Sequence, residues 1–158
     1  MSRPEITVAA VIEANGRFLL VEERIEQRLV INQPAGHVEA GETLLEAIIR
    51  EVREETAWGF TARALLGVYL WRHPGTGRIT KRFAFTGSVA DFSDQKLDEG
   101  IVGTHWLTRA ELKLREPQLR SPLVLRCIDD YLAGQRQPLA AVADLDLGSA
   151  LAVGAVGL

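Results

Sequence analysis

Short apolar runs separated by turn residues dominate the first forty positions of the chain. Residues 6–12 form a β-rich run, the Asn-Gly pair at 15–16 is a two-residue hairpin signal, and residues 17–22 return as a second run. A third short run, 29–31, leads into a loop over 34–41 that opens with Pro-Ala-Gly. We therefore predict a β-hairpin, a third short strand and a loop.

Residues 43–57 carry apolar side chains at helical spacing. At 100° per residue these side chains gather in one arc, as expected of a helix that faces a core. The arc consists of Leu44, Leu45, Ile48, Ile49 and Val52. We predict a helix that directly follows the loop.

Two longer strand-like runs, 60–71 and 79–89, are separated by a segment that contains one proline and two glycines. They are expected to pair antiparallel. Residues 102–107 predict a last strand. Thr108 with Glu111 three positions later is a capping-box signature, which predicts a short helix.

Ser121 and Pro122 are typical of a helix start with proline at the first helical position, and Gly134 can end that helix. The apolar stripe of this terminal helix is Val124, Leu125, Ile128, Tyr131 and Leu132. We predict one domain over residues 1–138. Residues 139–158 are apolar without a clear period. They could form a flexible tail, or an apolar strap that covers the core or a second subunit.

Composition narrows the class of protein. The 158 residues are 47% hydrophobic and 25% charged, which is ordinary for a globular domain. Cys127 is the only cysteine, so it is expected to be a small core residue rather than a disulfide or zinc ligand. No secretory signal or bilayer-length apolar stretch is present, which favours the cytoplasm and no membrane partner.

The charge pattern bears on partners. The formal net charge is −3 and the basic residues are scattered, so a nucleic acid polymer is not an expected partner. A protein of this kind that handles phosphates needs another positive charge, and a bound divalent cation would supply it.

Three glutamates of the predicted helix suggest where that cation binds. Glu51, Glu54 and Glu55 stand at i, i+3 and i+4, so their carboxylates share one sector and repel one another. Mg²⁺ prefers oxygen ligands and is typically held by a few carboxylates together with substrate phosphates. The alternative is a solvated acidic face of no chemical role.

A longer pattern favours the magnesium site. Its members, at fixed spacing, are Gly36, Glu42, Arg50, Glu51, Val52, Glu54 and Glu55. They closely resemble the Nudix box. The family pattern continues with a glycine and an aliphatic residue, where this chain has Ala57 and Trp58. Because alanine enters the left-handed conformation at a cost, the sequence leaves open whether the helix end is shifted.

The resemblance implies an α/β fold, the Nudix-type α/β/α sandwich with a mixed β-sheet, and Mg²⁺-dependent hydrolysis of a diphosphate linkage, with Mn²⁺ as a substitute cation. It implies that the cation bridges phosphate oxygens and activates the attacking water. Its ligands would be the Gly36 carbonyl with Glu51, Glu54 and Glu55. Glu51 is the best candidate for the base, Arg50 would orient its neighbours, and Glu42 would support them.

Further site residues are expected outside the box. Nudix enzymes often supply another acid from the loop before the last strand, where Asp98 and Glu99 stand, and Glu99 is the candidate ligand. Trp71, Arg72 and Arg82 lie near the ends of the paired strands and could stack on a heteroaromatic ring or hold phosphate oxygens. The alternatives are that Trp71 only packs in the core and that the two arginines are ordinary exposed residues.

A closer likeness within the family rests on five short segments, 7–9, 32–37, 119–124, 134–136 and 138–139. They resemble a phosphatase branch that releases phosphate from nucleoside tri- and diphosphates and from thiamine-type pyrophosphates such as hydroxymethylpyrimidine pyrophosphate. The likeness implies a small phosphate ester or anhydride as substrate. The alternatives are a Nudix pyrophosphohydrolase with another substrate preference and a catalytically silent Nudix-like binding module. The oligomeric state, monomer or homodimer, does not follow from the sequence.

Overall fold

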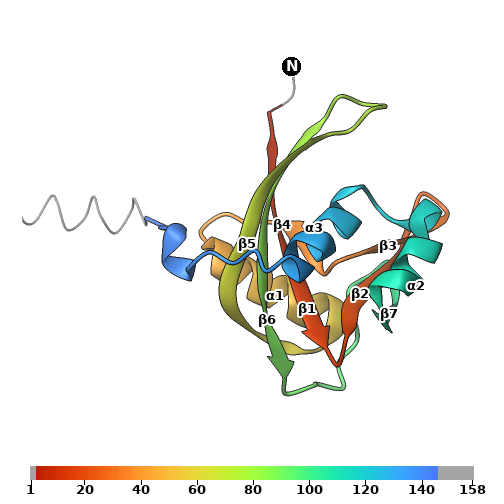
Figure 1. Cartoon of the computed structure of the whole chain (residues 1–158), viewed down its shortest axis with the longest axis horizontal. Helices are drawn as coiled ribbons and strands as arrows, with labels where there is room; N and C mark the ends of the chain where they lie inside the picture. The colour runs from red at the N-terminus through yellow and green to blue at the C-terminus, as the bar shows by residue number, and fades with distance from the viewer. Residues whose placement is uncertain (1–2, 146–158) are drawn as a thin grey trace, which may run out of the picture.

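The computed structural model describes residues 3–145, and its centre is a mixed seven-stranded sheet (Figure 1). The strand order is β3-β2-β1-β6-β5, with β4 paired to β1 and β7 paired to β2. Strands β1 and β6 run parallel and the other pairs antiparallel. The bounds are β1 Glu5–Ala14, β2 Arg17–Ile25, β3 Arg28–Asn32, β4 Ala35–His37, β5 Gly59–Arg72, β6 Ile79–Ala90 and β7 Ile101–Leu107.

Helices cover both faces of this sheet. Helix α1, Leu44–Thr56, buries Ala47, Ile48 and Val52 in one apolar cluster with β1, β5 and β6. Helices α2, Arg109–Leu114, and α3, Leu123–Leu132, pack in a second cluster on the other side. Two 3₁₀ turns, Glu116–Gln118 and Leu139–Ala141, complete the elements. The predicted α/β/α sandwich is confirmed.

Local sequence accounts for the hairpin that opens the chain. Asn15 and Gly16 connect β1 to β2 and have φ values of 52° and 78°. A two-residue hairpin turn needs positive φ at both central positions, and asparagine and glycine reach it at the least cost. The predicted hairpin is confirmed, and so are the antiparallel β5–β6 pair and the capping box at Thr108.

Helix α1 begins and ends where its sequence signals stand. Thr43 caps it, with its side chain accepting from the Glu46 N–H in a capping box. Ala57 follows the last turn in the left-handed conformation, with φ 67°, and its N–H donates to the Arg53 carbonyl. The helix end is therefore not shifted by the missing glycine. The Ala57 carbonyl accepts from the Arg53 guanidinium and the Ser93 N–H, which helps to hold the strained residue.

The structure corrects three local predictions. Ile49 is 44% exposed, because the buried side of α1 is completed by Glu51 and Glu55 rather than by a wider apolar arc. The segment predicted as a loop after Pro34 contains the short strand β4, which pairs with β1. Helix α3 starts at Leu123, one residue later than expected, and Leu132 at its end is exposed.

Residues 139–142 lie against the body of the protein. Leu139 and Val142 pack on the apolar cluster around α1, and the preceding Gln137 exchanges backbone hydrogen bonds with Leu65 of β5. Residues 146–158 lie outside the described residues, so the unit boundary at 138 stays a prediction. In the described part of the chain, no helix is both long and apolar enough to cross a bilayer.

Candidate active site

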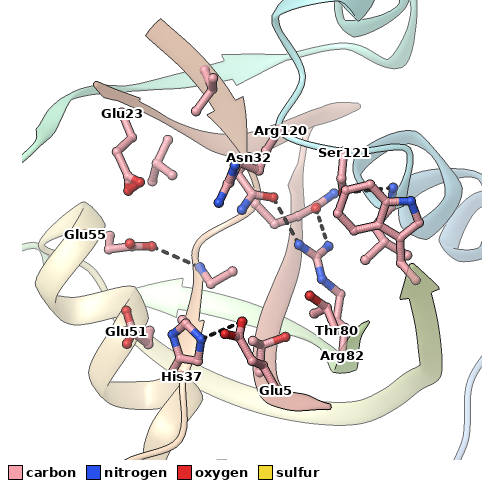
Figure 2. Close-up of a pocket in the computed structure, with 18 of the residues that line it drawn as sticks. Glu5, Glu23, Asn32, His37, Glu51, Glu55, Thr80, Arg82, Arg120 and Ser121 are labelled. Atoms are coloured by element: carbon pink, nitrogen blue, oxygen red, sulfur yellow. Dashed lines mark hydrogen bonds and ion pairs between the residues drawn. The ribbon is translucent and has the colours of Figure 1, made fainter. Parts of the chain in front are cut away.

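A pocket of about 400 Å³ is lined by residues of α1, of strands β1 to β6 and of the segment that leads into α3 (Figure 2). Five of the residues singled out from the sequence line it, namely Gly36, Glu51, Glu55, Trp71 and Arg82. Figure 2 shows Glu51, Glu55 and Glu23 on one side of the pocket, and Arg82, Asn32 and Arg120 on the other. The pocket therefore has an acidic wall that faces a basic and amide wall.

The acidic wall is built by α1 and by the adjoining strand β4. Glu51 and Glu55 are only 8% and 7% exposed, although both are acids. The Glu55 carboxylate accepts from the Ala35 N–H at 2.9 Å. Gly36 lies so close to Glu51 that a Cβ at this position would overlap the Glu51 carboxylate. The close approach explains why glycine, with no side chain, is needed here.

Arg50 links the carboxylates of the wall. Its guanidinium donates to Glu42 through Nε at 3.0 Å and Nη2 at 2.7 Å, to Glu51 at 2.9 Å and to Glu54 at 3.1 Å. It also donates to the His37 carbonyl at 3.0 Å, which ties α1 to the end of β4. The ion pairs expected of Arg50 are thus present, and Glu42 shares in them. Glu42 has a lowered pKa because Arg50 donates to its carboxylate.

The acidic wall is electrostatically strained. Burial raises the pKa of Glu55 to about 9, and the neighbouring carboxylates of Glu51, Glu23 and Asp98 add to this increase. Burial also raises the pKa of Glu51, although Arg50 acts against it. Buried acids that repel one another are stabilised by a cation, and perturbed acids of this kind are common at functional sites.

The structure brings the glutamates of the box together only in part. Glu54 contacts Arg50 from outside the pocket lining, and its side chain is 37% exposed. Burial and the Asp98 carboxylate raise its pKa. Among residues 3–145, no three carboxylates, imidazoles or thiolates form a ready-made metal cluster, and the Arg50 guanidinium donates to both Glu51 and Glu54.

Two further acids belong to this wall, Glu23, which no sequence signal indicates, and Asp98, the neighbour of the predicted ligand Glu99. Asp98 donates its N–H to the Glu54 carbonyl at 2.9 Å, and both Asp98 and the neighbouring Glu99 are exposed. Glu23 lines the pocket from β2, and burial raises its pKa. A carboxylate within a strand carries no periodic signal of its function, so only the folded register of β2 reveals it.

The basic and amide wall comes from β6 and from the end of β3. Arg82 is only 4% exposed and donates to Gln33 at 2.8 Å and to Asn32 at 3.1 Å. Trp71 lies on the adjacent strand, opposite Thr80. Arg72 is exposed and does not line this pocket, so it contacts only a shallow surface hollow beside Leu70.

The donor set fits a hard divalent cation. The carboxylate oxygens of Glu51 and Glu55 lie at one wall, and the Gly36 backbone is in close contact with Glu51. Oxygen donors of this kind suit Mg²⁺, whereas among the described residues the pocket lining offers a single imidazole, that of His37, and no thiolate for a zinc site.

Comparison with known proteins agrees with this geometry. The model of the NUDIX domain matches residues 1–127. The phosphatase NudJ of Shigella boydii is 39% identical over 147 residues, which is 92% of this chain and 95% of that protein. The phosphatase NudJ of Escherichia coli strain K12 has the same identity and coverage.

Solved structures show the same likeness. A NUDIX hydrolase from Nitrosomonas europaea has a TM-score of 0.89 and 44% identity, covering 91% of this chain and 99% of its own. The NUDIX domain of Shewanella oneidensis NrtR, solved with ADP-ribose, has a TM-score of 0.66 at 16% identity, covering 84% of this chain and 89% of its own, and it supports the fold alone. The chain belongs to the Nudix hydrolase family, whose members hydrolyse phosphorus-containing anhydrides.

Proposed function

We propose that this protein is a Mg²⁺-dependent phosphatase that releases orthophosphate from nucleoside tri- and diphosphates and from thiamine-type pyrophosphates, with Mn²⁺ as a substitute cation. The observation that carries the proposal is the pocket itself, in which buried glutamates face a buried arginine. The identity of 39% to NudJ phosphatases over nearly the whole chain supports the reaction type.

We assign the cation to Glu51, Glu54 and Glu55 with the Gly36 carbonyl. When bound, the divalent cation neutralises phosphate oxygens and lowers the pKa of water. Arg50 would keep Glu51 and Glu54 in place through the ion pairs described above. Of the acids in the loop before β7, the position of Asp98 beside Glu54 makes it a stronger candidate for an additional ligand than Glu99.

We assign proton transfer to Glu51. A water oxygen bonds to the terminal phosphorus while the bond from that phosphorus to the bridging oxygen breaks, and the water proton passes to the Glu51 carboxylate. Burial raises the pKa of Glu51, which brings the carboxylate nearer to working pH and makes it a better proton acceptor. Trp71 would contact the ring of the substrate at the pocket, and Arg72, outside it, could reach only a protruding group.

Products distinguish this reaction from that of a pyrophosphohydrolase. With a nucleoside triphosphate and Mg²⁺ in ¹⁸O-labelled water, we expect a nucleoside diphosphate and labelled orthophosphate. Excess EDTA should abolish turnover. A screen of nucleoside and thiamine-pathway pyrophosphates by catalytic efficiency would then rank the substrates. Monophosphate and pyrophosphate as the products would contradict the proposal, and so would negligible rates across the screen.

Replacement of Gly36 by alanine tests the close approach of β4 to Glu51. The added methyl group would push the flexible Glu51 carboxylate aside, since the two would overlap. We expect kcat/KM to fall by about 100-fold, because misplaced catalytic groups cost that much, while the melting temperature changes little. Alanine at Gly103, where nothing lies within 4 Å of an added Cβ, is the matched control and should keep its activity. Full activity of Gly36→Ala would remove the role assigned to this position.

A further inference from the structure

Arg82 is the most deeply buried charge of the pocket. It lies on β6 between Thr7 of β1 and Tyr69 of β5, so strands flank it on both sides. Its side chain is on the same side of the sheet as α3, whose Cys127 it touches. A guanidinium that is 4% exposed has lost almost all of its hydration. Such burial is costly unless an anion compensates the charge.

The hydrogen bonds of Arg82 do not provide that compensation. The guanidinium donates to the side-chain oxygens of Gln33 and Asn32 and to the Cys127 sulfur at 3.7 Å, and all three acceptors are neutral. Within residues 3–145 the Nε–H has no acceptor, and none of the groups that accept from Arg82 is a carboxylate. Five N–H groups with three acceptors leave two donors, the N–H of the buried Nε and one N–H of Nη2. Bidentate contact with an oxyanion uses two such donors of one guanidinium.

The surroundings of Arg82 limit what can approach it. Behind the guanidinium, Gln33 and Cys127 are 1% and 0% exposed, and the Gln33 amide is held by the Val124 carbonyl at 2.8 Å. The core is therefore closed on that side. The open side faces the pocket, whose opposite wall carries Glu51 and Glu55 (Figure 2). A group that reaches Arg82 from the pocket has no room for a further substituent behind it.

We propose that Arg82, positioned by Asn32 and Gln33, is a subsite for the terminal phosphoryl group, which selects substrates that end in an unsubstituted phosphate over those whose diphosphate is esterified at both ends. This inference rests on the proposed phosphatase function. A terminal phosphate has three free oxygens and about twice the charge of an internal one at neutral pH, so it compensates the buried guanidinium better.

Binding of two small probes to the full chain in Mg²⁺ tests the inference without turnover. Methyl phosphate mimics a chain end, and dimethyl phosphate mimics a phosphate that is esterified twice. By calorimetry we expect the natural chain to bind methyl phosphate about tenfold more tightly than dimethyl phosphate. Arg82→Gln should weaken the binding of methyl phosphate about tenfold. Arg63→Gln, which removes an exposed arginine of β5, is the matched control and should retain the preference.

Arg82→Lys keeps the charge but not the bidentate geometry, and we expect an intermediate affinity for methyl phosphate. This variant decides the question if Arg82→Gln does not fold, as judged by circular dichroism. Equal binding of both probes by the natural chain would overturn the inference. Unchanged methyl phosphate affinity in a folded Arg82 variant would also overturn it, and would leave Arg82 as a contact to the organic part of the substrate or as a structural residue.

The outcomes for this subsite and for the proposed function are separable. If the chain hydrolyses diphosphates to orthophosphate while Arg82→Gln keeps its probe binding and its KM, the subsite fails and the function stands. If no substrate is hydrolysed but the probe preference depends on Arg82, the function fails and the anion site stands. When both hold, Arg82→Gln should raise KM for a nucleoside diphosphate by about tenfold and change kcat less.

Discussion

Glu54→Gln is expected to lower kcat by about 10³-fold with the fold retained, because several kcal/mol of charge stabilisation are lost when a cation ligand is removed. The Glu54 side chain is 37% exposed and contacts only Arg50 and the Asp98 region. Its replacement therefore removes little packing. Phosphate release at saturating substrate in Mg²⁺, with circular dichroism as the check on folding, measures the effect.

Glu116→Gln provides the matched control for this change. Glu116 is an exposed acid beyond α2 whose ion pair is with Lys113, so the same charge is removed far from the pocket. It should leave kcat within about twofold, as expected for surface positions. A Glu54→Gln enzyme with the activity of the natural chain would exclude Glu54 from catalysis. If the natural chain itself binds substrate without turnover, it is a binding module instead.

Glu55→Gln is expected to make the cation-free protein more stable at pH 8 while activity is lost. Burial raises the pKa of Glu55 from its ordinary value of 4.5 to about 9. The folded state thus binds this proton more tightly than the unfolded state. The corresponding stability is fully present below pH 4.5 and is lost as the pH rises through about 9. Glutamine needs no proton, and its Oε1 can still accept from the Ala35 N–H.

Urea unfolding in EDTA between pH 5 and 9 measures this difference. At pH 8 we expect the variant to have a free energy of unfolding higher by about 1–3 kcal/mol, and near pH 5 the two proteins should converge. Some pH dependence should remain in the variant, since the pKa of Glu51 is raised as well. Saturating Mg²⁺ should stabilise the natural chain more than the variant. A variant that is less stable at pH 8 in EDTA would refute the strain assigned to Glu55.

Local signals were sufficient for most of the fold. The Asn-Gly turn, the capping boxes at Thr43 and Thr108 and the apolar period of α1 each determine structure within a few residues of themselves. Strand β4 could not be predicted in this way, because its pairing with β1 is a long-range contact. Ile49 was assigned to the core for a related reason: periodicity treats glutamate as a surface residue, whereas Glu51 and Glu55 occupy part of the buried face.

The site was predictable to the extent that it lies in one contiguous pattern. Gly36, Glu51 and Glu55 come together because strand β4 and helix α1, which carry them, are close in sequence. Glu23 and Asp98 reach the same wall from other elements, and no sequence spacing relates them to the helix. Arg82 was singled out by its position on a strand, but its burial without a charged partner emerges only from the packing of β6 against β1 and α3.

We infer that these clustered acids are tolerated because a divalent cation lies between them and the substrate. Anomalous diffraction from crystals grown with Mn²⁺ and a non-hydrolysable nucleotide tests it directly. We expect a peak at the acidic wall, with Glu51, Glu55 and the Gly36 carbonyl as ligands and Glu54 turned toward it. A peak elsewhere, or these carboxylates turned away from any ion, would contradict it.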